Sequence, residues 1–404
     1  MAENTRGSSL DLSRRTVMKS VGAGALLTGL AGCLGDETGE GGHFVAGAPE
    51  SGAAALPGGH VMSGMELRYQ EMEENEEFDE IPEGLFENSE CSAETATGYT
   101  TDAVARHDDL FAWLGGYCSP ETLATMGTTE EEGMLQIVTS FAPEVTETGH
   151  PYTFRAAPKS GVVVPPAVEY AFEELDGTQH AILGLNNDWG IDETEEWESQ
   201  VQDRGGEIVY NELFPGDQGD FTSEATQIAG SDPDVIFALG YHGSTANILQ
   251  SIHEQGMTAG EDVEIFIGTV AGFVLSGAVQ NEHIENVYTT NYYMGPGFEN
   301  YPEGVPDHMV DFQEKYEEEY GENTIRESAV GYTLVEAMIQ AMHEVDGEYH
   351  ENVDEMAEGL RDRDDGFMTP FGEMVFDETG QAEIPIFIAQ HNEDGEMFVV
   401  QDPQ

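Results

Sequence analysis

Short apolar runs alternate with longer amphipathic stretches from residue 43 onward, and this alternation restricts the fold more than any other feature of the chain. The runs have the length of single strands, and each stretch between them has the length of one helix. Apolar strands separated by helices are typical of parallel sheets that helices cover on both faces. The sequence therefore predicts an α/β fold. The predicted strands are residues 44–48, 111–115, 135–141, 180–185, 208–210, 235–240, 265–268 and 287–293, and the predicted helices include 59–74, 166–175, 192–204, 221–229 and 244–255.

The alternation is interrupted near Pro158, so that two separate series of strands and helices result. A chain of 404 residues is long enough for two domains of roughly 100–200 residues each. Two doubly wound lobes with parallel sheets are therefore expected. Beyond the second series the pattern becomes mainly helical, at residues 306–320, 326–344 and 353–361, and two closing strands are predicted at 373–376 and 385–390.

The charge is extreme, because 80 Asp and Glu residues stand against 13 Lys and Arg residues and give a net charge of -67. Self-repulsion of this size opposes a compact fold in dilute buffer, whereas at 1 M salt the Debye length falls to about 3 Å and screens it. We interpret the charge as adaptation to brine, of the haloarchaeal type. An acidic interaction tail is the alternative, but the acids are spread over the whole chain. Nucleic acid and anionic lipid headgroups are poor partners, because both require Lys and Arg to neutralise phosphate.

Residues 1–33 have the features of an export signal. Arg14 and Arg15 lie in a Ser-Arg-Arg-Thr-Val-Met-Lys segment that resembles a twin-arginine signal, and the apolar run at 21–30 is too short to span a bilayer. The run ends in Leu-Ala-Gly-Cys33, which resembles a lipobox whose cysteine is lipidated. We expect twin-arginine export and anchoring through Cys33 at the outer face of the cytoplasmic membrane, with residues 34–42 as a flexible tether. The alternative is a soluble helix with an unrelated cysteine.

Two further cysteines, Cys91 and Cys118, remain in the part of the chain that would be exported. Disulfides persist outside the cytoplasm, and two cysteines suffice for one bridge. We therefore expect a bridge between them, and two unpaired buried thiols are the alternative.

The sequence contains none of several common catalytic and cofactor-binding motifs, namely Gly-x-Ser-x-Gly, a phosphate-binding Gly-rich loop ending in Lys, His-Glu-x-x-His and Cys-x-x-Cys. The 12 histidines are scattered, and His242, next to Tyr241, is the one most typical of a site. We prefer a polar loop residue over a metal ligand as the interpretation of His242. Neither an enzyme nor a bound metal or cofactor is expected.

Six short segments have characteristic sequences in a characteristic order. They are Val-Ala-Gly-Ala-Pro-Glu-Ser-Gly at 45–52, Gly-Gly-Tyr-Cys-Ser-Pro at 115–120, Ser-Phe-Ala-Pro-Glu-Val-Thr at 140–146, Thr-Phe-Arg-Ala-Ala-Pro at 153–158, Asn-Asp-Trp-Gly at 187–190 and Phe-Asp-Glu-Thr-Gly at 376–380. Together they resemble the type I solute-binding proteins of the leucine/isoleucine/valine transporters, whose relatives bind urea, short amides or other small acids. The resemblance extends from about Gly42 to Val400. It implies a protein that delivers a small ligand to an ABC permease; the alternative is a ligand-binding subunit of a chemotaxis receptor.

The resemblance also implies two doubly wound parallel-sheet lobes joined by three crossover strands, and it matches Cys91 and Cys118 to a bridged pair. The ligand is expected in the cleft at the carboxyl ends of the strands, and hinge closure would bury it. The crossovers are expected near residues 155–159, 288–293 and 369–372, with 43–157 and 292–368 in one lobe and 158–291 and 369–404 in the other.

Three residues of the first lobe are candidates for contact with the polar part of the ligand. Ser119 opens a helix directly after a strand, so its hydroxyl and the nearby N–H groups suit a carboxylate or amide oxygen. Helix capping alone is the alternative role for Ser119. Backbone groups of Ser140 and Ala142, at the next strand end, are candidates to receive an ammonium or amide N–H, unless this is an ordinary loop.

Four further candidates would surround the rest of the ligand. Trp189 and Tyr241 follow strands of the second lobe, where an aromatic side chain can cover an apolar ligand, with packing alone as the alternative. Ser51 and Leu56 lie in the first loop, where the family sets the size of the ligand side chain.

One position departs from the family. Amino-acid binders of the family carry an acid after the strand expected here at 265–268, and that acid pairs with the ligand ammonium. Residues 265–281 contain no acid, and Val270 stands near the expected place. A buried ammonium without a counter-charge is costly. Either another acid replaces it, with Glu50 and Asp188 the first candidates, or the ligand is not an α-amino acid. Branched-chain amino acids, urea or amides, and small organic acids all remain candidates.

Overall fold

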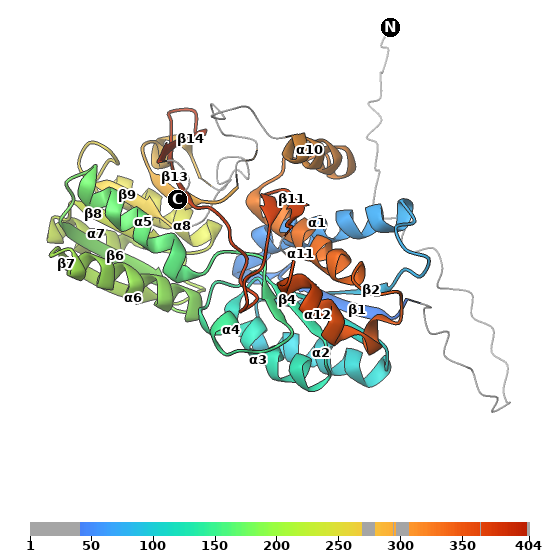
Figure 1. Cartoon of the computed structure of the whole chain (residues 1–404). Coiled ribbons are helices and arrows are strands. Elements are labelled where there is room, and N and C mark those ends of the chain that lie inside the picture. The colour runs from blue at the N-terminus through green and yellow to red at the C-terminus, as the bar shows by residue number, and fades with distance from the viewer. Residues whose placement is uncertain (1–40, 269–278, 294, 296–306, 364, 402–404) are drawn as a thin grey trace, which may run out of the picture. The chain divides into compact units, whose positions relative to one another are not determined.

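The computed structural model describes residues 41–268, 279–293, 295, 307–363 and 365–401 (Figure 1). The twin-arginine segment, Cys33, tether residues 34–40 and the position of Val270 lie outside these ranges. Within the described ranges, no helix has both the length and the hydropathy needed to cross a membrane.

The first sheet contains five strands, and every neighbouring pair is parallel. The three central strands are buried along their whole length, as expected of apolar runs with helices on both faces. In spatial order the strands are β2 (Glu83–Asn88), β1 (His43–Ala48), β3 (Leu110–Gly115), β4 (Leu135–Val138) and β5 (Thr153–Arg155). The helices in this part of the chain are η1 (Gly52–Ala54), α1 (Ala55–Glu74), α2 (Ala93–Arg106), α3 (Ser119–Glu131) and α4 (Glu144–Glu147).

The second sheet contains seven strands, of which five are parallel and two, at one edge, are antiparallel. In spatial order they are β14 (Met397–Gln401), β13 (Phe387–His391), β10 (Tyr288–Asn291), β9 (Glu264–Ile267), β8 (Val235–Leu239), β6 (Gln179–Leu185) and β7 (Glu207–Phe214). Its helices are α5 (Ser160–Glu173), α6 (Asp188–Asp203), α7 (Thr222–Ser231), α8 (His242–Glu254) and α9 (Asn281–Ile284). The α/β class predicted from the alternation is confirmed, with the antiparallel edge as an addition.

The chain passes between the two sheets three times. It leaves the first sheet after β5, leaves the second after β10, and returns to the second to form β13 and β14. Between the last two passages lie α10 (Asp307–Tyr320), α11 (Arg326–Met342), η2 (Tyr349–Glu351), α12 (Val353–Arg361) and the hairpin β11 (Phe367–Thr369) with β12 (Gly372–Met374).

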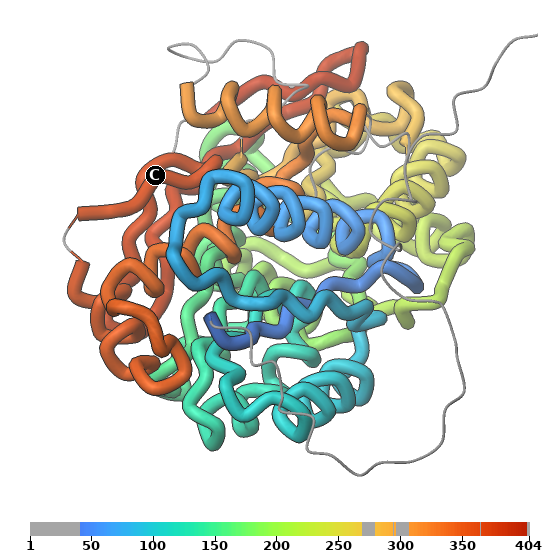
Figure 2. The backbone as a smooth tube through the Cα atoms, turned by 90° about the vertical axis from the view of Figure 1, so that its right-hand side faces the viewer, coloured from blue at the N-terminus to red at the C-terminus, as the bar shows by residue number. Residues whose placement is uncertain are grey.

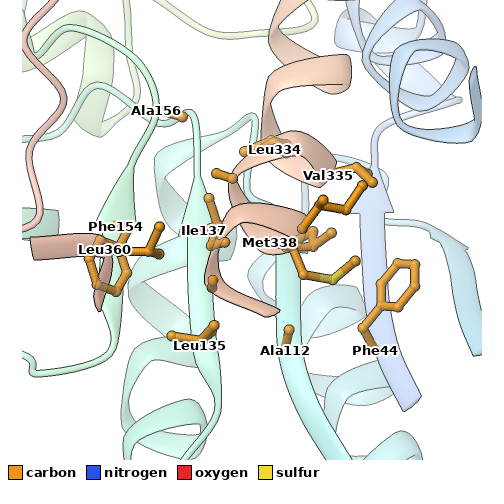
Figure 3. Close-up of a cluster of buried hydrophobic side chains, with 14 of the residues drawn as sticks. Phe44, Ala112, Leu135, Ile137, Phe154, Ala156, Leu334, Val335, Met338 and Leu360 are labelled. Carbon is orange, nitrogen blue, oxygen red and sulfur yellow. The ribbon is translucent and has the colours of Figure 1, made fainter. Parts of the chain in front are cut away.

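Helix α11 is buried along almost its whole length and packs both on the first sheet and on α1. Leu334, Val335 and Met338 project from α11 into a cluster with Phe44 and Ile137 of the sheet (Figure 3). Burying each such side chain contributes roughly 1.5–3 kcal/mol. Segments far apart in sequence therefore form one core, and Figure 2 shows α1 in blue beside the orange and red carboxyl-terminal segments.

The crossing of α1 and α11 is close because glycine lies on both helices. A Cβ atom on Gly64 would lie 2.1 Å from the carbonyl oxygen of Ser328, and one on Gly331 would lie 1.9 Å from the carbonyl oxygen of Val61. No side chain fits at these distances. The contact holds the first turn of α11, which begins at Arg326, in a fixed place.

Candidate ligand-binding site

A small cavity lies at the carboxyl ends of strands from both sheets. Its volume is about 40 Å³, enough for roughly three water molecules. Parallel strands end at the same edge of a sheet, and the loops that follow them commonly form the binding site. The lining residues are Tyr117, Cys118 and Ser119 after β3, Thr139 and Phe141 after β4, Trp189 after β6, Gly240 and Tyr241 after β8, Tyr292 after β10, and Arg326, Glu327 and Val330 of α11.

Five aromatic rings form most of the apolar wall. The rings of Trp189 and Tyr241 stack at 5.6 Å between centroids, and Tyr117 lies 6.3 Å from Tyr241. The Phe141 ring meets Trp189 edge to face at 6.5 Å and lies 6.4 Å from Tyr292. Such a wall can pack against an apolar group of a ligand, and its ring faces also attract cations.

A buried ion pair occupies another side of the cavity. Arg326 and Glu327 are the first two residues of α11 and are 5% and 0% exposed. A guanidinium N–H of Arg326 donates to Oε1 of Glu327, and the Tyr117 hydroxyl donates to the same oxygen at 3.5 Å. The guanidinium also lies over the Tyr292 ring at 5.4 Å. Burial lowers the pKa of Arg326, but Glu327 and the phenol groups of Tyr292 and Tyr117 raise it by more than burial lowers it. The pKa of Arg326 is therefore raised overall, and the guanidinium stays charged.

Three polar atoms of this pair have no hydrogen-bond partner among the described residues. They are Nε and Nη1 of Arg326 and Oε2 of Glu327. A buried polar atom without a partner costs about 1–3 kcal/mol, and more when it is charged. Such atoms at a cavity wall are suited to a ligand, with Arg326 complementary to a carboxylate and Glu327 complementary to an ammonium or amide N–H.

A second buried acid supports the aromatic wall from behind. Glu193 of α6 is buried, and its Oε1 accepts a hydrogen bond from the indole N–H of Trp189 at 2.6 Å. Burial raises the pKa of Glu193 to about 8, although Trp189 and Arg326 both act to lower it. Glu193 is therefore mainly protonated at neutral pH and holds the Trp189 ring without adding a charge.

Three of the residues singled out in the sequence come together around this cavity: Ser119, Trp189 and Tyr241. The Ser119 hydroxyl accepts the backbone N–H of Ala142 at 3.4 Å, which ties the loops after β3 and β4 together. The Tyr241 hydroxyl accepts a hydrogen bond from the Asn187 side chain at 3.2 Å.

Ser140 and Ala142 lie behind the lining. The Ser140 hydroxyl donates to Thr122 at 3.0 Å, and the carbonyl oxygens of Ser140 and Ala142 accept from Nη1 of Arg155 at 3.2 and 2.6 Å. The two carbonyl oxygens that were predicted to accept hydrogen bonds from a ligand thus accept them from Arg155.

Ser51 and Leu56 lie away from the cavity lining. The Ser51 hydroxyl accepts a hydrogen bond from Asn88 at 3.2 Å, and Leu56 is 39% exposed. Glu50 and Asp188 are not among the lining residues either. The first loop turns toward the end of β2 instead, because the backbone N–H of Glu50 also donates to Asn88 at 2.9 Å.

A disulfide joins Cys91 to Cys118, with 5.4 Å between the Cα atoms. Cys118 lines the cavity, and both sulfur atoms lie near the Tyr241 hydroxyl, at 3.4 Å for Cys91 and 3.2 Å for Cys118. Below the bridge, Glu121 accepts from the Cys118 backbone N–H at 3.3 Å and from the Ser89 hydroxyl at 2.6 Å. Burial raises the pKa of Glu121 to about 7.

Sequence reasoning missed the charged pair and several of the rings. Arg326 carried a signal, because Lys and Arg number only 13 in this chain and this one begins a segment that is mostly apolar. The others carried no comparable signal, since aromatic residues are common in cores. The missed lining residues are Tyr117, Thr139, Phe141, Gly240, Tyr292, Arg326, Glu327 and Val330.

Residues 48–396 match the sequence profile of the family described as periplasmic binding protein. The amino acid binding protein of Pseudomonas aeruginosa is 27% identical over 154 residues, which cover 38% of this chain and 41% of that protein. The Leu/Ile/Val-binding protein homolog 7 of Brucella melitensis is 20% identical over 317 residues, or 74% of this chain and 76% of that protein.

Solved structures share the fold. The leucine binding protein of Thermotoga maritima superposes with a TM-score of 0.75 at 19% identity, covering 90% of this chain and 97% of that one. A solute-binding protein of an ABC transporter from Rhodopseudomonas palustris, in complex with benzoate, gives a TM-score of 0.76 at 15% identity, covering 89% and 95%.

Proposed function

This chain belongs to the periplasmic binding protein family, and we propose that it is the extracytoplasmic solute-binding protein of an ABC importer. Its relatives are named as binding proteins for amino acids or as solute-binding proteins of transporters, and none of these names is that of an enzyme. A cavity whose walls come from distant parts of the chain suits capture by hinge closure, the mode of binding expected for such proteins. The two lobes expected from the sequence, 43–157 with 292–368 and 158–291 with 369–404, are the bodies that would move.

The ligand class follows from one observation, the buried pair with unpartnered atoms at the cavity. Two nitrogen atoms of Arg326 suit a carboxylate, and the free oxygen of Glu327 suits an ammonium. The five rings suit an apolar side chain. An α-amino acid with an apolar or aromatic side chain offers all three groups at once. Glu327 then supplies the counter-charge that residues 265–281 lack.

Charge balance favours a zwitterion over a simple acid. Arg326 and Glu327 sum to zero formal charge, so a zwitterionic ligand leaves the closed cavity neutral. A benzoate-like ligand adds one uncompensated negative charge next to Glu327, which is costly in a poorly hydrated site. A small aromatic acid is the second candidate, because the rings and Arg326 alone would suffice for it and relatives are solved with such acids.

Calorimetric titration in molar KCl separates the two candidates. Leucine and phenylalanine are compared with 4-methylpentanoate, which lacks the ammonium, with leucinamide, which lacks the carboxylate, and with benzoate. We expect leucine or phenylalanine to bind, and both truncated analogues to bind at least 30-fold more weakly, the equivalent of about 2 kcal/mol. Binding of benzoate with no binding of amino acids would select the second candidate.

Two variants test the roles of the pair. Arg326→Gln should weaken every carboxylate ligand by about 30-fold or more. Glu327→Gln should weaken amino acids to a similar degree but leave benzoate unaffected or bound more tightly. The control is Glu322→Gln, in the loop before α11, which should change neither. The proposal is wrong if no carboxylate binds to the wild-type chain, or if Arg326→Gln leaves binding intact.

Membrane attachment completes the proposal. We infer twin-arginine export, lipid anchoring through Cys33 and a permease partner in the membrane, from the signal-like segment in residues 1–33. Cys33→Ser should release the protein into the medium or leave it unprocessed, and replacement of Arg14 and Arg15 by Lys should block export. A Cys33→Ser protein that stays with the membrane fraction as the wild type does would contradict the anchor.

A further inference from the structure

Two histidines and two carboxylates meet at the amino ends of the first sheet. His43 is the first residue of β1 and lies between β2, which begins at Glu83, and β3, which begins after Asp109. The register pairs His43 with Glu83, and the His43 backbone N–H donates to the carbonyl of Asp109 at 3.1 Å. His107 ends α2, two residues before Asp109. The backbone therefore fixes these residues next to one another before any side-chain contact is considered.

The side-chain geometry concentrates donor atoms. Nδ1 of His43 lies 2.7 Å from Oδ1 of Asp109, and Nε2 of His43 lies 3.6 Å from Oε2 of Glu83. The His43 and His107 rings are 4.0 Å apart between centroids. One donor atom from each of His43, His107 and Asp109 lies within 4.8 Å of the other two.

We propose that His43, His107 and Asp109 form a binding site for a divalent transition metal ion of the zinc class, with water as a fourth ligand and the Glu83 carboxylate beside the other ring nitrogen of His43. Imidazole nitrogen and carboxylate oxygen are normal ligands of zinc, at about 2.0–2.2 Å, which places neighbouring donors ~3.3 Å apart in a tetrahedron. Movements of up to about 1.5 Å take donor atoms that lie within 4.8 Å of one another to that spacing. Imidazole donors also favour zinc, nickel and copper over magnesium and calcium.

The residues of the site differ in how far they are buried and in how freely they can move. His43 is only 5% exposed and held by the sheet, whereas the Glu83 side chain is 67% exposed and His107 lies at a helix end. A metal can enter from solvent, and His107 can adjust its position to bind it. Bound there, the ion would link β1 to the loop between α2 and β3, which carries His107 and Asp109.

The site is separate from the ligand cavity. The cavity lies at the carboxyl ends of the strands and this cluster at the amino ends, with the six-residue strand β1 between the two levels. Six residues of strand correspond to roughly 17–20 Å. Metal binding should therefore leave the affinity for the captured solute unchanged.

The experiment must distinguish metal binding at this site from metal binding to the many carboxylates of the surface. The full chain, prepared without a polyhistidine tag, is titrated with Zn²⁺ in molar KCl and excess Mg²⁺, and with Co²⁺ as an optical probe. Excess Mg²⁺ occupies sites made of oxygen alone. We expect one equivalent of Zn²⁺ to bind, and one equivalent of Co²⁺ to develop the visible absorption of a tetrahedral site with nitrogen ligands.

Two variants and a matched control locate the ion. His107→Asn and Asp109→Asn should each weaken Zn²⁺ binding at least tenfold, as loss of a ligand or its support does. His150→Asn, which removes a histidine paired with Glu130 at 2.9 Å on the same part of the fold, should leave binding unchanged. Circular dichroism identifies any variant that fails to fold, and the partly exposed His107 makes its variant the safer one.

The proposal is overturned if the wild-type chain binds no stoichiometric Zn²⁺, if excess Mg²⁺ displaces it, or if His107→Asn binds as tightly as His150→Asn. Loss of solute binding in a folded His107→Asn protein would contradict the separation of the two sites.

Discussion

In the proposed function, Arg326 and Glu327 serve binding at the expense of stability. Both are buried, and three of their polar atoms lack a partner in the described part of the chain. Replacing a buried ion pair with apolar residues of similar volume is often neutral or stabilising by about 1–4 kcal/mol, whereas removing one partner costs about 3–5 kcal/mol.

The pair therefore has a distinctive mutational signature. Arg326→Met and Glu327→Leu should each destabilise the ligand-free protein by about 3 kcal/mol or more, and the double variant should be no less stable than the wild type. Solute binding should be lost in all three. Thermal unfolding in molar salt measures the difference, and a double variant less stable than either single one would show that the pair is a structural contact.

Glu193 makes stability depend on pH in a defined window. Its pKa of about 8 in the folded protein lies above the ordinary value of 4.5, so folding takes up a proton between these values. Its stabilising contribution is fully present below about pH 4.5 and is lost as the pH rises through about 8. His180 and His391, whose pKa values burial lowers to about 4, act in the opposite sense, but only below pH 6.5.

Between pH 6.5 and 9 the melting temperature should therefore fall, with Glu121 contributing in the lower part of that range. Glu193→Gln keeps an acceptor for Trp189 but does not ionise, so its melting curve should fall less steeply. Glu195→Gln, at an exposed position of the same helix, should follow the wild type. Equal slopes for all three proteins would show that Glu193 is ionised already at neutral pH.

At the scale of elements, the crossing of α1 and α11 connects packing to the cavity. Gly64→Ala adds a methyl group where Ser328 leaves no room, and overpacking of this kind costs about 1–3 kcal/mol. If α11 shifts to relieve this overlap, Arg326 and Glu327 move with it. Solute affinity should therefore fall together with stability.

Gly127→Ala in α3 is the matched control, because its Cβ would meet no atom within 4 Å. That change should stabilise the protein by about 0.5–1 kcal/mol and leave binding unchanged. Thermal unfolding and titration on the same samples provide both readouts. Normal binding in a destabilised Gly64→Ala protein would separate the helix crossing from the site.

The elements differ in how well the sequence predicts them. Long apolar runs predicted β1, β3, β6, β8 and β9 close to their observed bounds, since burial on both faces leaves a clear pattern. β2 was missed because it is an edge strand with the acidic sequence Glu-Gly-Leu-Phe-Glu-Asn, and β5 because it has only three residues. The strand expected at 373–376 is part of the hairpin of β11 and β12, a local contact that strand-like composition does not distinguish from a sheet.

The site shows the same division. Ser119, Trp189 and Tyr241 could be predicted to lie together because each follows a strand within a few residues, and the carboxyl ends of parallel strands meet at one edge of a sheet. Arg326 and Glu327 reach the cavity only because α11 packs against α1 and the first sheet, more than 200 residues after Tyr117. No local pattern encodes that long-range contact.

At the scale of the whole molecule, a net charge of -67 has to coexist with two compact sheets. We expect a cooperative fold above about 1–2 M salt, where screening shortens the Debye length to a few ångströms. Dialysis into dilute buffer should abolish tertiary structure, because self-repulsion is then unscreened. Near-UV circular dichroism measures this, and a spectrum that is unchanged at low salt would refute adaptation to brine.

The contact between the disulfide and the cavity has an optical consequence. The chain has three tryptophans, and Trp113 and Trp197 are fully buried in the cores of the two sheets. Only Trp189 lines the cavity, where it stacks on Tyr241, whose hydroxyl lies against the Cys91–Cys118 sulfurs. Disulfides and neighbouring rings quench indole fluorescence at short range, so we expect emission from Trp189 to respond when the loop that carries Cys118 moves relative to Tyr241. If this cavity captures the solute, we expect Trp189 fluorescence to change on binding, and the kinetics of binding could then be followed without an added label.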